Sequence, residues 1–275
     1  MRDHHSIPIH FAHANGFPMG SYRRMFDGLG DGIEIFGLPK FAHSPLFPVN
    51  TNFENLNLEL VHYLENQVRQ PVYLVGHSMG AVMSFMVACD RPDLVKGLIM
   101  LDPPIVSGLS RILFKTVKLV GQIDRITPAS KSKFRCQSWD KDTNLVNYFK
   151  DKALFKKFEL GCIQDYVSSA IDEKNGRLHL NYDAKIETEV YRNVPHNIHL
   201  YSKRLLVPAW IISGEKSELN TPFFLSSFLK NTKVKQHVLS NGGHMFPFEQ
   251  PTEVAELIKA KILEWEFVNE KTALN

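Results

Sequence analysis

Ser78 stands in a short segment whose residues suit nucleophilic chemistry. The segment reads Gly-His-Ser-Met-Gly at 76–80, between an apolar run at 72–75 and an almost wholly apolar stretch at 79–88. A strand that turns this tightly into a helix needs small residues two places before and two places after the serine, and it projects the hydroxyl above the sheet. The N–H of Met79, at the start of the helix, faces the same space and can hold an oxyanion.

A histidine that could activate this serine follows near the other end of the chain. The segment 241–251 reads Asn-Gly-Gly-His-Met-Phe-Pro-Phe-Glu-Gln-Pro, with His244 between a predicted strand and a predicted final helix. An imidazole beside the serine takes its proton and later returns it to the leaving group. The chain has twelve histidines, and the flanking glycines, strand and helix distinguish His244 from the others.

A serine–histidine pair needs a carboxylate that fixes the imidazole tautomer. Two acidic residues are candidates. Asp102 follows an apolar run at 98–101 and precedes two prolines, whereas Glu218 lies in the segment Gly-Glu-Lys-Ser-Glu at 214–218. Both follow predicted strands that end beside the same site, so either carboxylate can reach the histidine.

These residues must be positioned by alternating strands and helices. Short apolar runs alternate with longer helical patterns, which predicts a mostly parallel sheet covered by helices. The predicted strands are 7–12, 33–36, 72–75, 98–101, 207–212 and 234–239. Apolar residues at helical spacing predict helices that contain Phe53, Leu56, Leu60 and Leu64, and Val254, Leu257, Ile258, Ile262 and Trp265.

The alternation stops for about a hundred residues after 101. We expect an α/β core domain formed by 1–103 and 206–275, with 104–205 inserted as a mostly helical cap. Helical patterns occur around 145–158 and 160–170 in this insertion. It also contains many aromatic side chains, which favours an apolar pocket for substrate.

One helix of this insertion is basic and amphipathic. Leu109, Ile112, Leu113, Val117 and Val120 share one face, and Arg111, Lys115 and Lys118 share the other. Such a helix could lie on a membrane surface. The cap interpretation is favoured, because the flanking strands place this segment inside the domain.

Taken together, these motifs resemble the α/β-hydrolase superfamily, in particular its small capped bacterial serine esterases. The resemblance covers essentially the whole chain outside the insertion and includes His-Ala-Asn-Gly-Phe-Pro at 13–18. That segment is similar to the family's oxyanion loop, and aligning its Gly-Phe-Pro implies that the Phe17 N–H is the second oxyanion donor beside Met79. The family's usual histidine position is then Asn15. Because the first strand begins at residue 7, the sheet should have about six strands.

The resemblance also bears on the acid. Most members of the family carry it at the position that corresponds to Ser217, which cannot serve as a carboxylate. Some members, including certain small esterases and dehalogenases, place it at the strand end where Asp102 lies. We therefore favour a triad of Ser78, Asp102 and His244 over one that uses Glu218.

The reaction expected of such a triad is hydrolysis of a carboxylic ester through an acyl-enzyme. Thioester hydrolysis, cleavage of carbon–carbon bonds and perhydrolysis use the same apparatus, and fold alone does not choose among them. A non-catalytic binding protein of the same fold is the alternative from another class. The intact serine, histidine and oxyanion loop disfavour it.

Bulk composition narrows the partners and the compartment. The net charge of +3 over 275 residues gives no reason to expect nucleic acid or an anionic membrane as partner. Three widely spaced cysteines form neither a disulfide framework nor a metal motif. No segment has the roughly 20 apolar residues that span a bilayer. We expect a cytoplasmic enzyme with a small-molecule ester substrate, no cofactor and no metal; the sequence does not indicate an oligomeric state.

Overall fold

A six-stranded sheet forms the centre of the molecule. The computed structural model describes residues 6–232 and 234–273. The strand order is β2-β1-β3-β4-β8-β9, and every neighbouring pair is parallel. The strands are β1 (Ile7–Ala12), β2 (Ile33–Phe36), β3 (Val72–His77), β4 (Val95–Leu101), β8 (Ala209–Gly214) and β9 (Lys235–Leu239). The predicted α/β fold with a parallel sheet of about six strands is confirmed.

The two faces of this sheet bury different side chains of the same strands. In β3, Val72 and Leu74 pack into one apolar cluster, while Tyr73 and Val75 pack into the other. This alternation follows from the two-residue period of a strand. Because both faces are covered, the strand is apolar at every position from 72 to 75, as a strand in a parallel sheet is expected to be.

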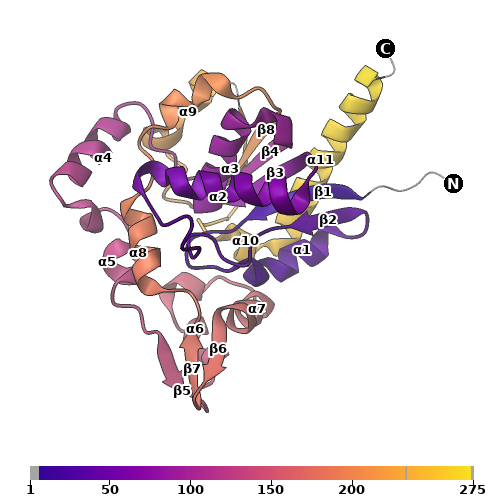
Figure 1. Ribbon diagram of the computed structural model, residues 1–275. Helices are drawn as coiled ribbons and strands as arrows, with labels where there is room; N and C mark the ends of the chain where they lie inside the picture. The colour runs from indigo at the N-terminus through magenta and orange to yellow at the C-terminus, as the bar shows by residue number, and fades with distance from the viewer. Residues whose placement is uncertain (1–5, 233, 274–275) are drawn as a thin grey trace.

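Helices cover both faces (Figure 1). Helices α2 and α3 contact each other and pack on one face together with α9, and α1 and α11 pack on the other. Their bounds are α1 (Arg23–Leu29), α2 (Glu54–Tyr63), α3 (Met79–Asp90), α9 (Pro222–Thr232) and α11 (Pro251–Ala273), and a short helix, α10 (Phe246–Glu249), precedes α11. The apolar stripe predicted in α2 is confirmed, since Leu56 and Leu60 are fully buried.

The segment between β4 and β8 folds apart from the main sheet; most of it lies below the sheet in Figure 1, and α4 lies to the left. Its helices are α4 (Ser110–Leu119), α5 (Ala129–Ser132), α6 (Leu145–Lys150), α7 (Leu160–Ala170) and α8 (Ala184–Arg192). It also contains an antiparallel sheet in the order β5-β7-β6, built from β5 (Ser138–Asp140), β6 (Ile171–Lys174) and β7 (Arg177–Leu180).

Sequence periodicity did not predict this small sheet. Its strands have only three or four residues each and carry charged side chains, so they lack the apolar alternation of a longer strand. The helical pattern expected over 145–158 is also divided, because α6 ends at Lys150 and a short 3₁₀ turn follows at 153–155.

Helix α3 lies unusually close to the sheet. A Cβ atom added at Gly80 would lie 2.0 Å from the carbonyl oxygen of Ala12 in β1, and one added at Gly76 would lie 2.4 Å from the carbonyl oxygen of Gly80. Both contacts are with backbone atoms, which cannot move without moving a strand or a helix. The two glycines of the serine motif therefore allow β1, β3 and α3 to meet.

We predict that Gly80→Ala lowers the free energy of unfolding by about 3 kcal/mol, because overpacking against backbone forces a shift of α3. This loss is expected although alanine is the better helix former by about 1 kcal/mol. Urea denaturation followed by circular dichroism measures it.

Gly121→Ala is the matched control. A Cβ there meets nothing within 4 Å, and only the positive φ of 68° opposes it, which costs about 1 kcal/mol. Equal losses in the two variants would contradict the close approach at Gly80.

Candidate active site

Ser78 occupies a strained turn between β3 and α3. Its φ of 53° and ψ of −115° lie outside the regions that residues with side chains usually adopt, and such a conformation costs about 1–3 kcal/mol. The Ser78 N–H donates to the Leu101 carbonyl at 2.9 Å, which anchors the turn to β4. The strain is maintained by these neighbours, and it holds the hydroxyl at the carboxyl edge of the sheet.

The imidazole of His244 lies within hydrogen-bonding distance of this hydroxyl. His244 Nε2 is 3.0 Å from Ser78 Oγ, although the two residues are 166 positions apart in sequence. The loop that carries the histidine is stabilised by Glu249, whose carboxylate accepts the Gly243 N–H at 2.9 Å. The Glu in the 241–251 motif therefore fixes the backbone just before the histidine.

The carboxylate of Asp102 lies on the other side of the imidazole. Its Oδ2 is 2.6 Å from His244 Nδ1 and also accepts the hydroxyl of Ser217, and its Oδ1 accepts the Gly214 N–H at 3.2 Å. The Asp102 side chain is only 1% exposed. The structure brings Asp102, and not Glu218, to the histidine; the Glu218 side chain is exposed.

The positions of the protons follow from the kinds of partner. A carboxylate accepts hydrogen bonds only, so His244 Nδ1 carries the proton and donates to Asp102. The unprotonated Nε2 is then free to accept the hydrogen bond of the Ser78 hydroxyl. This is the arrangement in which an imidazole can act as general base toward a serine.

A buried series of hydrogen bonds connects the loop after β1 to the backbone of His244. The sequence analysis did not predict it. The Ala14 N–H donates to the Tyr22 hydroxyl at 3.0 Å, and that hydroxyl lies 2.7 Å from His77 Nδ1. His77 Nε2 donates to the His244 carbonyl at 3.0 Å. Burial, helped by the nearby His244, holds the pKa of His77 well below its ordinary value. His77 is therefore neutral, so its Nδ1 can accept the Tyr22 hydroxyl.

The loop that follows β1 also lies at this edge of the sheet. His13 is fully buried, with its Nδ1 2.8 Å from the Ala14 carbonyl and its Nε2 accepting the Phe41 N–H at 2.8 Å. The Phe17 N–H, expected from sequence as an oxyanion donor, donates to the Ala14 carbonyl at 3.1 Å. Within the described residues, the N–H groups of Asn15 and Met79 have no hydrogen-bond acceptor.

Residues of the inserted segment contact the loop after β1, and among them is a buried ion pair. Arg135 Nη1 lies 2.7 Å from a carboxylate oxygen of Glu187, and the guanidinium also contacts the Tyr166 hydroxyl. A Cβ at Gly16 would come within 2.9 Å of Glu187 and 3.1 Å of Arg135. The side-chain amide of Asn15 donates to the Glu187 carbonyl at 2.9 Å.

Aromatic packing joins the loop after β1, the inserted segment and α10. Phe17 contacts the rings of Phe155, Phe158 and Tyr166 from the inserted segment and that of Phe248 from α10, with centroids 5.1–6.1 Å apart. The rings of Phe158 and Phe248 stack at 4.8 Å. The loop after β1 and the turn that follows His244 are thus packed against the inserted segment.

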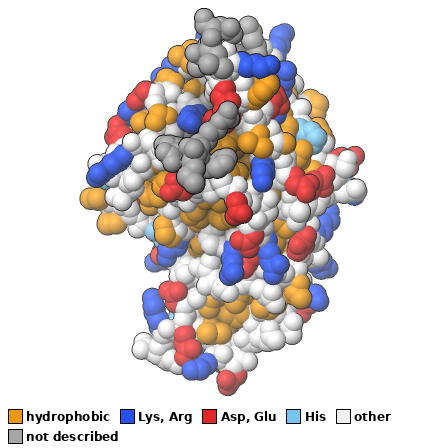
Figure 2. All heavy atoms as spheres, turned by 90° about the vertical axis from the view of Figure 1, so that its right-hand side faces the viewer, with side chains coloured by type: hydrophobic (Ala, Val, Ile, Leu, Met, Phe, Trp, Pro, Cys, Tyr) orange, Lys and Arg blue, Asp and Glu red, His pale blue; other side chains and the backbone are white. Residues whose placement is uncertain are grey.

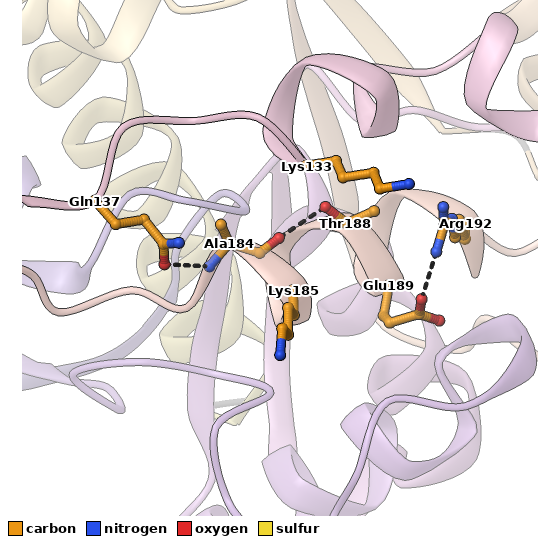
Figure 3. A pocket seen from close by; sticks show the side chains of 7 residues that line it. All are labelled: Lys133, Gln137, Ala184, Lys185, Thr188, Glu189 and Arg192. Atoms are coloured by element: carbon orange, nitrogen blue, oxygen red, sulfur yellow. Dashed lines mark hydrogen bonds and ion pairs between the residues drawn. The ribbon is translucent and has the colours of Figure 1, made fainter.

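A surface hollow of about 450 Å³ lies elsewhere, between the end of α5 and helix α8 (Figure 3). Its lining is Lys133, Gln137, Ala184, Lys185, Thr188, Glu189 and Arg192. None of these residues contacts Ser78 or His244, so this hollow is separate from the serine–histidine site. Within residues 6–232 and 234–273, no group of three His, Cys, Asp or Glu side chains could hold a metal ion.

Comparison with known proteins bears on the family and the fold of this chain. The sequence model of the alpha/beta hydrolase family matches residues 11–257. A monoglyceride lipase homolog of monkeypox virus is 30% identical over 50% of this chain and 56% of its own length. Lipase LipV of Mycobacterium tuberculosis is 36% identical over 26% of this chain and 27% of its own length.

A solved structure, the thioesterase domain from the curacin biosynthetic pathway, superposes with a TM-score of 0.73. Its sequence is 19% identical, and the match covers 92% of this chain and 90% of that domain. At this level of identity the likeness bears on the fold alone. The two structures thus share the sheet and helices on which the Ser78 site is built.

From the hydrogen bonds of Asp102 we predict that Asp102→Asn lowers kcat at the Ser78 site by on the order of 10⁴, because an amide stabilises the wrong imidazole tautomer. Glu218→Gln is the control. The Glu218 carboxylate is exposed to solvent, so removing its screened charge should change the rate less than about fivefold. Steady-state kinetics on both variants decides between the two acids. A crippled Glu218→Gln enzyme beside a nearly normal Asp102→Asn enzyme would reverse the assignment.

The buried chain through Tyr22 generates a second prediction. Tyr22→Phe leaves the Ala14 N–H and His77 Nδ1 without their partner, so we expect the free energy of unfolding to fall by about 2 kcal/mol. Tyr148→Phe should change it by less than about 0.5 kcal/mol, since the Tyr148 hydroxyl has no hydrogen-bond partner within the described part of the chain. Thermal and urea unfolding of both variants provide the comparison, and indistinguishable losses would show that the chain does not stabilise the fold.

Proposed function

This chain belongs to the alpha/beta hydrolase family, and we propose that it is a serine hydrolase that cleaves carboxylic esters through an acyl-enzyme intermediate. One observation carries the proposal. Ser78 Oγ, both ring nitrogens of His244 and a buried carboxylate oxygen of Asp102 form one continuous hydrogen-bonded series, with distances of 3.0 and 2.6 Å. Lipases among its relatives support the choice of an ester.

The proposed reaction has two halves. Ser78 Oγ attacks the ester carbonyl while His244 Nε2 takes the serine proton, and the tetrahedral intermediate then expels the alcohol, which leaves with that proton. Water attacks the resulting acyl-serine with His244 again as base, which releases the acid and regenerates Ser78. Asp102 stabilises the imidazolium in both halves, and its three hydrogen-bond donors keep it oriented throughout.

We propose that backbone N–H groups hold the oxyanion in each half. Met79 is one donor, since its N–H begins α3 next to Ser78. The loop after β1 supplies the other. Phe17 can serve only if its N–H leaves the Ala14 carbonyl, whereas the Asn15 N–H is unengaged among the described residues. We therefore propose Asn15 as the donor in the resting loop, in place of the Phe17 expected from sequence.

In this proposal residues 1–103 and 206–275 form the catalytic core, and 104–205 form a cap. The ion pair at Gly16 and the aromatic contacts of Phe17 support it, since both come from the inserted segment and meet the oxyanion loop. The many aromatic side chains of the inserted segment favour an apolar acyl or alcohol group in the substrate. Free thiols at Cys89, Cys136 and Cys162 accord with a reducing compartment, and we propose the cytoplasm.

The test is hydrolysis of p-nitrophenyl esters of increasing acyl length. We expect Ser78→Ala to lower kcat/KM by at least about 10³, since losing a triad nucleophile costs several orders of magnitude, while circular dichroism stays that of the parent. EDTA should leave the rate unchanged. A variant within tenfold of the parent, or a rate lost to EDTA and restored by zinc, would contradict the mechanism. Faster turnover of a matched thioester would replace the ester as substrate class and keep the triad.

A further inference from the structure

Helix α4 presents its apolar face to solvent. Large apolar side chains that lie more than half exposed follow one side of this helix and its two ends, namely Leu109 at 83%, Ile112 at 55%, Leu113 at 56%, Leu119 at 77% and Val120 at 61%. In a surface helix this face ordinarily packs against the core. The sequence predicted the apolar stripe and its helix, but in the structure most of the stripe points away from the protein.

Polar contacts on the opposite side of α4 hold it in this orientation. Lys118 Nζ donates to the Val194 carbonyl at 2.7 Å, Arg111 Nη1 lies 3.1 Å from His199 Nε2, and the Ser110 hydroxyl donates to the Ser107 carbonyl. Phe114 packs against the core on this inner side. The outward apolar face is therefore fixed by contacts of the folded chain. Helix α4 itself lies at the left of the molecule in Figure 1.

The surroundings of α4 are strongly basic. Residues 104–134 contain six Lys and Arg against one acidic residue, a net charge of +5, although the whole chain carries only +3. Lys115, Arg125, Lys131 and Lys133 are exposed, and the single acid, Asp124, pairs with Arg192. On the face shown in Figure 2, by contrast, acidic and basic side chains are interspersed. The basic charge of the chain is thus concentrated in residues 104–134, although the net charge of the whole chain is low.

The apolar face of α4 and the basic charge around it together indicate what covers this face. An apolar helix side flanked by lysine and arginine matches an interface of acyl chains beneath anionic head groups. A second copy of the chain would bring one +5 segment against another, which like-charge repulsion opposes. A hollow beside the helix is lined by Lys115, Lys118 and His196, together with Arg192, which pairs with Glu189 of the same lining. The exposed Lys115 can meet a phosphate there. Within the described residues no helix is long and apolar enough to cross a bilayer.

We propose that α4 and the basic segment around it, residues 104–134, dock the protein on an anionic lipid surface. Leu109, Leu113 and Leu119 enter the acyl region, and Lys115 and its basic neighbours contact the phosphates. Docking depends on the exposed apolar face and the basic charge of this segment, and it is independent of the reaction at Ser78.

The experiment is co-sedimentation of the full chain with vesicles of phosphatidylcholine, alone or mixed with phosphatidylglycerol. We expect binding to the mixed vesicles, weak binding to phosphatidylcholine alone, and loss at high salt because salt screens surface charge. The double variant Leu113→Gln/Leu119→Gln and the single variant Lys115→Glu should each weaken binding by about tenfold or more. Thermal unfolding checks that each variant is folded.

Matched controls lie elsewhere on the surface. Leu46→Gln/Leu58→Gln replaces two leucines that are 77% and 54% exposed, and Lys235→Glu reverses an exposed charge at the amino end of β9. Both should bind vesicles like the parent. Absence of vesicle binding, equal losses in α4 and control variants, or a dimer in sedimentation velocity that the α4 variants dissociate would each overturn the proposal. Ester hydrolysis in solution is measured separately, so its failure and a failure of docking are distinguishable.

Discussion

The buried carboxylate of Asp102 is the point at which the separate parts of this molecule are joined. It lies at the end of β4, accepts the Gly214 N–H from the end of β8, and accepts hydrogen bonds from Ser217 and from His244. A carboxylate that is 1% exposed would be costly to bury without such partners. Three donors from two loops therefore stabilise the charge, and in doing so they set the position of the histidine relative to the serine at the end of the neighbouring β3.

The opposite side of the site depends on contacts between the loop after β1 and the rest of the chain. Tyr22 and His77 connect the backbone at Ala14 to the backbone at His244. The Arg135–Glu187 ion pair of the inserted segment packs directly against Gly16. Because a bulkier residue at Gly16 would collide with this pair, the glycine in the loop is explained by packing as well as by its positive φ of 79°. The inserted segment thereby contributes to the geometry of the loop.

Local sequence was informative wherever a short segment determines its own structure. The glycines around Ser78 predicted a tight turn after a strand, and the segment around His244 predicted a histidine between a strand and the last helix. The structure brings the two side chains within 3.0 Å of each other. Helix 160–170 was predicted within its observed bounds, since its apolar spacing is regular. The choice between Asp102 and Glu218 was narrowed only by family likeness, because it depends on how two loops fold in space. The structure supplies the contact that sequence lacked.

Features that depend on distant pairings were not predicted. Tyr22 and His77 meet across 55 positions, and Arg135 and Glu187 across 52, and no local pattern marks such partners. The strands of the small sheet are too short to show a period. For α4 the periodicity predicted the stripe correctly but not its direction, because Lys118 and Arg111 find acceptors on the protein side. An amphipathic pattern predicts that the apolar face of a helix is buried, but it does not show whether the protein core or another partner buries it.

The proposed reaction depends on Ser78 as a nucleophile that His244 activates. The most direct measurement is the intact mass of the protein after exposure to a fluorophosphonate, followed by peptide mapping, since this reagent phosphonylates an activated serine without requiring knowledge of the substrate. We predict a single adduct on Ser78, formed rapidly in the parent and slowed strongly by His244→Ala, with the fold unchanged. Unmodified protein, or an adduct on another residue that forms equally fast without His244, would contradict the account.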